Sequence, residues 1–167
     1  MHNSTFSLPL PSALSENEAV PHDASGKAYI PALDPNAVAH GGMMTTPYDL
    51  ALFAIELMKE YCGKSDKILS PEMAKKLFCN ERKLDPSDMF GLSMSEGMGV
   101  FISGEGENIS FLFPGSNAPG SECWIIGYPC SGKGIAIMAN GEMGSLLAME
   151  IIAAASTVYN WPVFYSK

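Results

Sequence analysis

Apolar side chains recur at helical spacing in the segment that begins at Thr46. They follow the i, i+3, i+4, i+7, i+8 and i+11 pattern of one helix face: Leu50, Phe53, Ala54, Leu57, Met58 and Tyr61. The hydroxyl of Thr46 is suited to cap such a helix, and Gly63 is suited to end it. We expect a second, shorter helix over residues 70–78, followed by a loop over 80–89.

From residue 98 onward the apolar period changes to that of strands. Four runs bounded by Gly, Pro or Asn show it, at 98–103, 109–113, 122–128 and 133–139. Their short connections predict antiparallel pairing. A closing helix is expected over 142–159. Because its only charges are Glu142 and Glu150, we expect it to be buried across the sheet.

This order of elements predicts a single α+β domain over residues 1–167, with two helices at 46–79. Its antiparallel sheet is expected to have three to four strands over 98–139, packed by helices. Six of the 12 prolines fall within residues 1–47, which disfavours a long helix there. We therefore expect residues 1–45 to form an extended arm held against a partner surface or wrapped around the domain.

Charge and composition narrow the functional classes. The 167 residues include 18 Asp and Glu against 10 Lys and Arg, a net charge of −8, which argues against a nucleic-acid partner. The hydrophobic content of 47% is enough for a core. No apolar run reaches the roughly 20 residues of a membrane span. The first residues show no signal peptide, so the compartment stays open.

The cysteines and histidines are scattered. They are Cys62, Cys79, Cys123, Cys130, His2, His22 and His40, with no C-x-x-C spacing. We therefore predict neither a metal site nor a cofactor, and we expect buried thiols.

Residues 127–134 match the G-x-x-x-x-G-K part of a phosphate-binding loop. Gly134 stands where that loop needs a Ser or Thr, and a strand pattern follows where a helix would be needed. We interpret 131–134 as a hairpin turn instead. The chain also lacks a G-x-S-x-G nucleophile elbow.

Residues 41–53, Gly-Gly-Met-Met-Thr-Thr-Pro-Tyr-Asp-Leu-Ala-Leu-Phe, carry a family resemblance. They resemble the Gly-Gly-Leu-x-Ser/Thr-Thr-x-x-Asp-Leu-x-x-Phe signature of beta-lactamase-related serine hydrolases, the class C and penicillin-binding-protein-like group. Residues 1–11, 68–72 and 134–141 look like further segments of that family, in the same order. The resemblance covers only the C-terminal part of the family. It implies the C-terminal half of the beta-lactamase/transpeptidase-like fold.

That family uses three catalytic motifs, beginning with Ser-x-x-Lys. This chain has no Ser-x-x-Lys, so no catalytic residue is predicted in it. Ser15-Glu16-Asn17 and His40-Gly41-Gly42 match the other motifs only by chance, because they lie on the wrong side of the scaffold segments. The resemblance places the third motif on a strand. It implies that the substrate-binding residues there are Phe113, Gly115, Ser116 and Asn117. Phe113 replaces a Lys or His there, and the N–H of Ser116 corresponds to an oxyanion donor.

Two functions follow from the resemblance, and an unrelated α+β fold is the third alternative. The first is the C-terminal part of a hydrolase of the ester, amide or lactam class, inactive by itself. The second is a non-catalytic binding or assembly module. In that family N-terminal strands continue the sheet, so strand 133–139 would be an open edge here. We expect a homo-oligomer or a missing N-terminal region to cover it.

Overall fold

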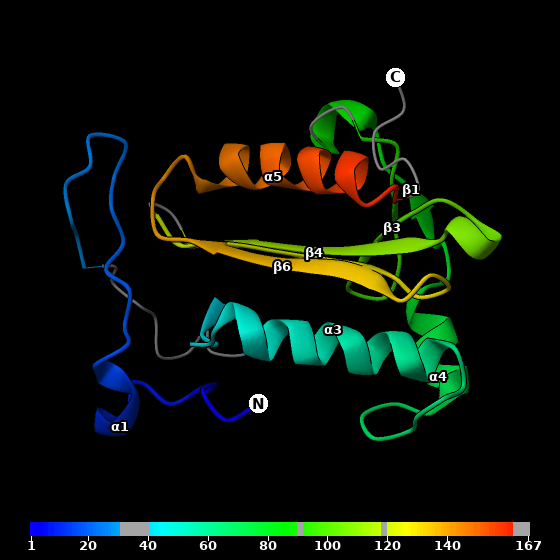
Figure 1. Ribbon diagram of the computed structural model, residues 1–167, viewed down its shortest axis with the longest axis horizontal. Coiled ribbons are helices and arrows are strands. Elements are labelled where there is room, and N and C mark those ends of the chain that lie inside the picture. Colours follow the sequence, from blue (N-terminus) through cyan, green and yellow to red (C-terminus); the bar gives the residue numbers. More distant parts are fainter. Residues whose placement is uncertain (31–40, 90–91, 118–119, 162–167) are drawn as a thin grey trace.

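The protein is arranged in three layers. The computed structural model describes residues 1–30, 41–89, 92–117 and 120–161. Figure 1 shows an antiparallel sheet with helix α3 (Pro47–Tyr61) on one face and helix α5 (Gly144–Val158) on the other. The α+β class predicted from the sequence is confirmed.

The sheet is larger than predicted. Among the described residues it has six strands in the order β1 to β6, where three to four were expected. They are β1 (Arg82–Lys83), β2 (Ser95–Glu96), β3 (Phe101–Ser103), β4 (Ser110–Ser116), β5 (Glu122–Tyr128) and β6 (Lys133–Ala139). The additional β1 and β2 have two residues each, too few to show an alternating pattern. They exist because β3 offers an edge on which β2, and then β1, can pair.

Helices α3 and α4 (Pro71–Leu77) begin at the predicted caps. Thr46 Oγ1 accepts the N–H of Asp49 at 3.2 Å, and Ser70 Oγ accepts that of Met73 at 3.3 Å. Each hydroxyl satisfies a backbone donor that the helix leaves unpaired. The predicted loop over 80–89 also contains β1 and the short 3-10 turn η1 (Pro86–Met89).

Two apolar clusters fill the spaces between the layers. On the α3 side, the buried side chains are Leu50, Ala54, Leu57, Met58, Phe78, Val100, Ile102, Ile109, Phe111 and Ile125. On the α5 side, they are Leu92, Met94, Leu112, Trp124, Ile126, Tyr128, Ala148 and Ile152. Strands β4 and β5 contribute to both clusters, because successive side chains of a strand point to opposite faces.

The closing helix lies across the sheet, but it is not buried all round. On α5 only Gly144, Ala148 and Ile152 are buried. Leu146 on the opposite face is 52% exposed. The apolar outer face therefore has no cover among the described residues.

The N-terminal arm contacts two parts of the domain. Near its start, Thr5 pairs with Met44, and further along His22 forms an isolated bridge with Gly141 after β6. The short helix α1 (Ser12–Ser15) lies between these contacts, at the outer end of the molecule in Figure 1. Residues 31–40 of the predicted arm lie outside the described residues.

The predicted hairpin is confirmed, whereas the prediction of buried thiols is wrong for three of the four cysteines. Strands β5 and β6 form the predicted hairpin, in which the N–H of Gly132 donates to the carbonyl oxygen of Tyr128 at 2.9 Å. Gly132 has φ of +66°, a conformation that glycine adopts without strain. The thiols of Cys62, Cys79 and Cys130 are exposed rather than buried, because they lie at helix ends and in this turn.

Two leucines on α3 test this packing. Leu57 is 1% exposed and Leu52 is 37% exposed. We expect Leu57→Ala to lower the free energy of unfolding by about 2–5 kcal/mol through lost burial and the cavity left behind. Leu52→Ala, the matched control, should cost under about 1 kcal/mol. Urea unfolding measures both, and equal losses would contradict the assignment of the buried face.

Candidate functional site

The predicted third-motif residues lie at the end of β4, where one side of the strand is open. The N–H of Asn117 donates to the carbonyl oxygen of Ser121 on the β5 side at 2.9 Å. Because backbone groups alternate in direction along a strand, the N–H of Ser116 points away from β5. Strand β3 does not reach that far, since its last pair is Phe101 with Leu112.

The sequence of β4 fits this open side. Pro114 has no N–H to donate, and it occupies the same outward-facing register as Ser116. Gly115, between them, pairs with Cys123 of β5. The end of β4 therefore presents an outward backbone N–H at the position where the resemblance places an oxyanion donor.

The side chain of Phe113 belongs to the α3-side core. Its ring meets those of Phe53 and Phe111 edge-on, with centroids 6.1 and 5.7 Å apart. Such pairs stabilise a core by about 0.5–1.5 kcal/mol beyond the area they bury. A phenyl ring carries neither a charge nor a transferable proton, so this position packs the strand against α3 and supplies no acid, base or cation.

A buried carboxylate holds Ser116 from the α5 side. Glu122, directly opposite Ser116 on β5, is 7% exposed. Its Oε1 accepts the Ser116 hydroxyl at 2.7 Å, and its Oε2 accepts the Ser145 hydroxyl of α5 at 2.5 Å. Bonds from hydroxyls to an ionised acceptor are among the stronger protein hydrogen bonds. Glu122 thus ties the end of β4 to the first turn of α5.

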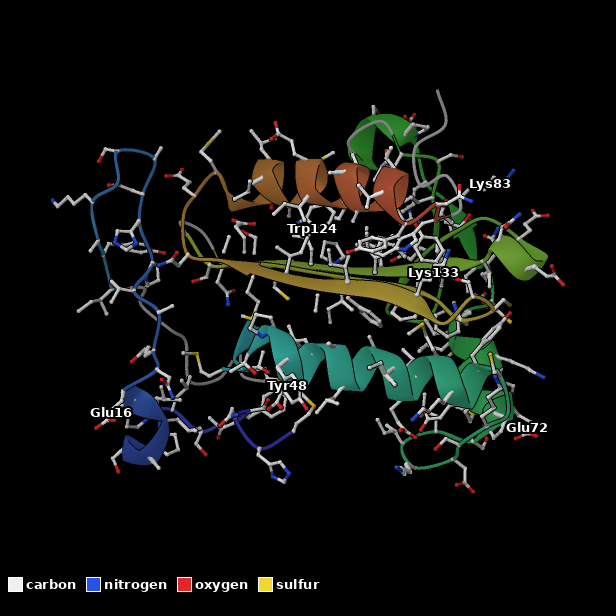
Figure 2. All side chains as sticks on the ribbon, in the orientation of Figure 1. Glu16, Tyr48, Glu72, Lys83, Trp124 and Lys133 are labelled. Atoms are coloured by element: carbon white, nitrogen blue, oxygen red, sulfur yellow. The ribbon has the colours of Figure 1, made fainter. Side chains whose placement is uncertain are left out.

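Two further contacts complete this network. The indole N–H of Trp124 donates to Ser145 Oγ at 3.1 Å. Figure 2 shows Trp124 between α5 and the sheet. A Cβ on Gly144 would lie 2.9 Å from Glu122 Cγ, so the helix start leaves no room for a larger residue. Glu122 was not among the residues predicted from the sequence, although a charged residue at the start of the apolar run 122–128 was the available signal.

The turn after β4 is held by segments distant in sequence. Asn117 Nδ2 donates to the carbonyl oxygen of Gly41 at 2.8 Å. A Cβ on Gly120, which has φ of +82°, would lie 2.4 Å from the carbonyl oxygen of His22. The turn thus brings Gly41 and the arm to the candidate site. Residues 118–119, which lie between Asn117 and Gly120 in this turn, are outside the described residues.

A second buried carboxylate fixes the start of the arm to α3. Asp49 Oδ2 accepts the Ser4 hydroxyl at 2.7 Å and the N–H of Asn3 at 2.8 Å. The hydrogen bond from Ser4, together with that from Asn3, lowers the pKa of the Asp49 carboxyl. Asp49 therefore stays ionised near neutral pH and holds the arm through donors that favour its charged form.

Of the chance matches of the other motifs, Ser15-Glu16-Asn17 lies apart from this end of β4, whereas Gly41 of His40-Gly41-Gly42 contacts it by accepting the hydrogen bond from Asn117. Figure 2 shows Glu16 at the outer end of the arm, and His40 lies outside the described residues. Across the described ranges no three His, Cys, Asp or Glu side chains are grouped to hold a metal ion. The described part of the site suits binding of a carbonyl or amide group by outward backbone groups.

Among the comparisons with known proteins, those with solved structures agree on the fold. No family model matches the sequence, and no curated protein matches it. A class C beta-lactamase structure superposes with a TM-score of 0.66 and 16% identity, over 92% of this chain and 47% of that chain. A penicillin-binding protein from Bacillus halodurans gives 0.60 and 20%, over 87% and 41%. The protein SurE gives 0.68 and 21%, over 89% and 34%.

This chain therefore spans less than half the length of the structures it resembles. At 16–21% identity the likeness concerns architecture. The chain has the fold of one part of the class C beta-lactamases and penicillin-binding proteins.

Glu122 offers a test of how the candidate site is built. Glu122→Gln keeps the side-chain size but replaces one of the two oxygens that accept the hydroxyls of Ser116 and Ser145 with an amide NH2, which donates and cannot accept. We expect the free energy of unfolding to fall by about 1–3 kcal/mol. Glu150→Gln, an exposed change on α5, is the control and should be neutral within about 0.5 kcal/mol. Thermal denaturation compares the two, and an unchanged Glu122→Gln protein would refute the network.

Proposed function

We propose that this chain is the C-terminal part of a beta-lactamase-related serine hydrolase that acts on an ester, amide or lactam. The observation that carries the proposal is the outward N–H of Ser116 on the open side of β4, in a fold shared with a class C beta-lactamase. The nucleophile and its lysine would come from residues outside this chain, which lacks Ser-x-x-Lys. By itself the chain would be inactive.

In this proposal the end of β4 binds the substrate carbonyl during acyl transfer. A serine attacks the carbonyl carbon, and the N–H of Ser116 donates to the oxygen as negative charge develops there. One such donor is worth about 2.7–4 kcal/mol of transition-state stabilisation. The hydrogen bond from Ser116 to Glu122 holds this residue in place. Since Phe113 packs in the core and carries no charge, it would not bind a charged group of the substrate.

The remainder of the fold would cover three uncovered surfaces. Helix α3 exposes Tyr48, Leu52 and Ile55 on its outer face, and α5 exposes Leu146 on its own. Strand β6 is the last strand of the sheet. We propose that an N-terminal region, or failing that a second copy of the chain, pairs with β6 and covers these apolar faces, because uncovered edges and patches of this kind promote association.

A non-catalytic binding or assembly module is the second candidate. The packing of Phe113 against Phe53 and Phe111 favours it, since the third-motif position is committed to the core. Such a module would keep the strand and its outward N–H for binding an extended segment.

An active-site probe separates the two functions. Under the hydrolase proposal, a fluorescent penicillin or fluorophosphonate leaves this chain unlabelled. It labels the serine of an upstream Ser-x-x-Lys in the longer gene product, because only the nucleophile forms the acyl or phosphonyl bond. Mass spectrometry locates the label, and Ala at that serine is the control. An unlabelled longer protein would favour the binding or assembly module. A labelled serine in this chain would refute the proposal that the nucleophile lies outside it.

Pairing at β6 is tested by a proline whose effect is confined to the open side. The register with β5 directs the N–H of Met138 outward. We expect the isolated chain to self-associate at tens of micromolar, and Met138→Pro to weaken association by about tenfold or more through loss of that donor. Met138→Ala is the control. Light scattering measures the mass, and a purely monomeric chain would count against an edge that needs cover.

A further inference from the structure

Three exposed cysteines gather around one end of α3. Cys62 follows the helix directly, Cys79 follows α4, and Cys130 lies in the β5–β6 turn. The ring of Tyr61, which precedes Cys62, packs edge-on against that of Phe78, which precedes Cys79, with centroids 5.1 Å apart. The ends of α3 and α4 therefore lie side by side.

Cys62 lies close to the backbone of Cys130, whereas Cys79 is directed elsewhere. Cys62 Sγ donates to the carbonyl oxygen of Pro129 at 3.3 Å. That oxygen belongs to the planar peptide unit that ends at the Cα of Cys130. The Cys62 sulfur therefore touches the backbone from which the Cys130 side chain starts, although the two residues are 68 positions apart.

The other two cysteines are directed elsewhere. Cys79 Sγ turns back to the carbonyl oxygen of Lys75 on its own helix, at 3.6 Å. Cys123 lies within β5, where burial raises the pKa of its thiol to about 11. Cys130 Sγ, in a turn at the surface, donates to the carbonyl oxygen of Gly106 at 3.7 Å. A rotation about its Cα–Cβ bond redirects this sulfur without moving the sheet.

We propose that Cys62 and Cys130 form a reversible disulfide that fastens the end of α3 to the β5–β6 turn. The oxidant is a small-molecule disulfide such as oxidised glutathione. One cysteine thiolate attacks it, which forms a mixed disulfide and releases one reduced glutathione. The second thiolate then attacks the protein sulfur of that bond and releases the other. Two thiols lose two protons and two electrons, and one disulfide of the oxidant is reduced.

The physical consequence is a closed loop across the core. The bond would join the α3 layer to the strand pair that carries both apolar clusters. Closing so long a loop restricts the unfolded chain and raises the melting temperature by about 4–16 °C. The chemistry needs no hydrolase activity, so it stands independently of the proposed function.

The test uses the chain as purified. Reduced protein is incubated with oxidised glutathione at pH 8.5, alkylated and digested with chymotrypsin, which cuts after Tyr61, Phe78 and Trp124 and so separates all four cysteines. We expect a chain lighter by two hydrogen atoms, with Cys62 and Cys130 in one cross-linked pair. A thiol reductant should reverse both the bond and the rise in melting temperature.

Matched serine variants complete the design. Cys79→Ser should keep the cross-link, whereas Cys62→Ser and Cys130→Ser should lose it and carry a stable glutathione adduct on the remaining cysteine. Two outcomes would overturn the proposal. One is persistent glutathione on both Cys62 and Cys130 of the unsubstituted chain. The other is a cross-link that uses Cys79 or Cys123.

Discussion

The rest of the structure depends on strand β5 being buried on both faces. Its alternating side chains send Ile125 into the α3-side cluster, and Trp124, Ile126 and Tyr128 into the α5-side cluster. Burying one such side chain contributes roughly 1.5–3 kcal/mol. Helices α3 and α5 therefore do not stabilise the sheet separately, since each packs against the opposite face of the same central strands.

This two-sided burial also places the candidate site. The register of β4 on β5 sets Ser116 opposite Glu122, and β3 ends four residues short of Ser116. One side of β4 is paired with β5 along its length, and the other side is open at Ser116 because β3 ends at the Phe101–Leu112 pair. The position of the outward N–H is thus a consequence of core packing, and a shift of one residue would turn it toward β5.

Buried carboxylates then attach the peripheral segments to this core. Asp49 holds the arm, Glu122 holds the first turn of α5, and Glu60 accepts the N–H groups of Ile68 and Leu69 at 2.6 and 3.1 Å. All three carboxyl groups are buried, and the hydrogen bonds that they accept offset the cost of that burial. Their shared role is to position segments.

The local pattern of the chain determined most of the elements, because caps and apolar period act over a few residues. Thr46 and Ser70 cap their helices, and β5 and β6 occupy the predicted 122–128 and 133–139. Contacts between distant segments decided the rest. Two-residue strands form only on a neighbour's edge, exposed thiols result from where helices and turns end, and Glu122 gains its partners only when α5 crosses the sheet. The sequence determined which side chains face a core, whereas the tertiary structure decided what lies opposite them. The physical reason is that the spacing of apolar residues along the chain does not encode the distance to a residue dozens of positions away.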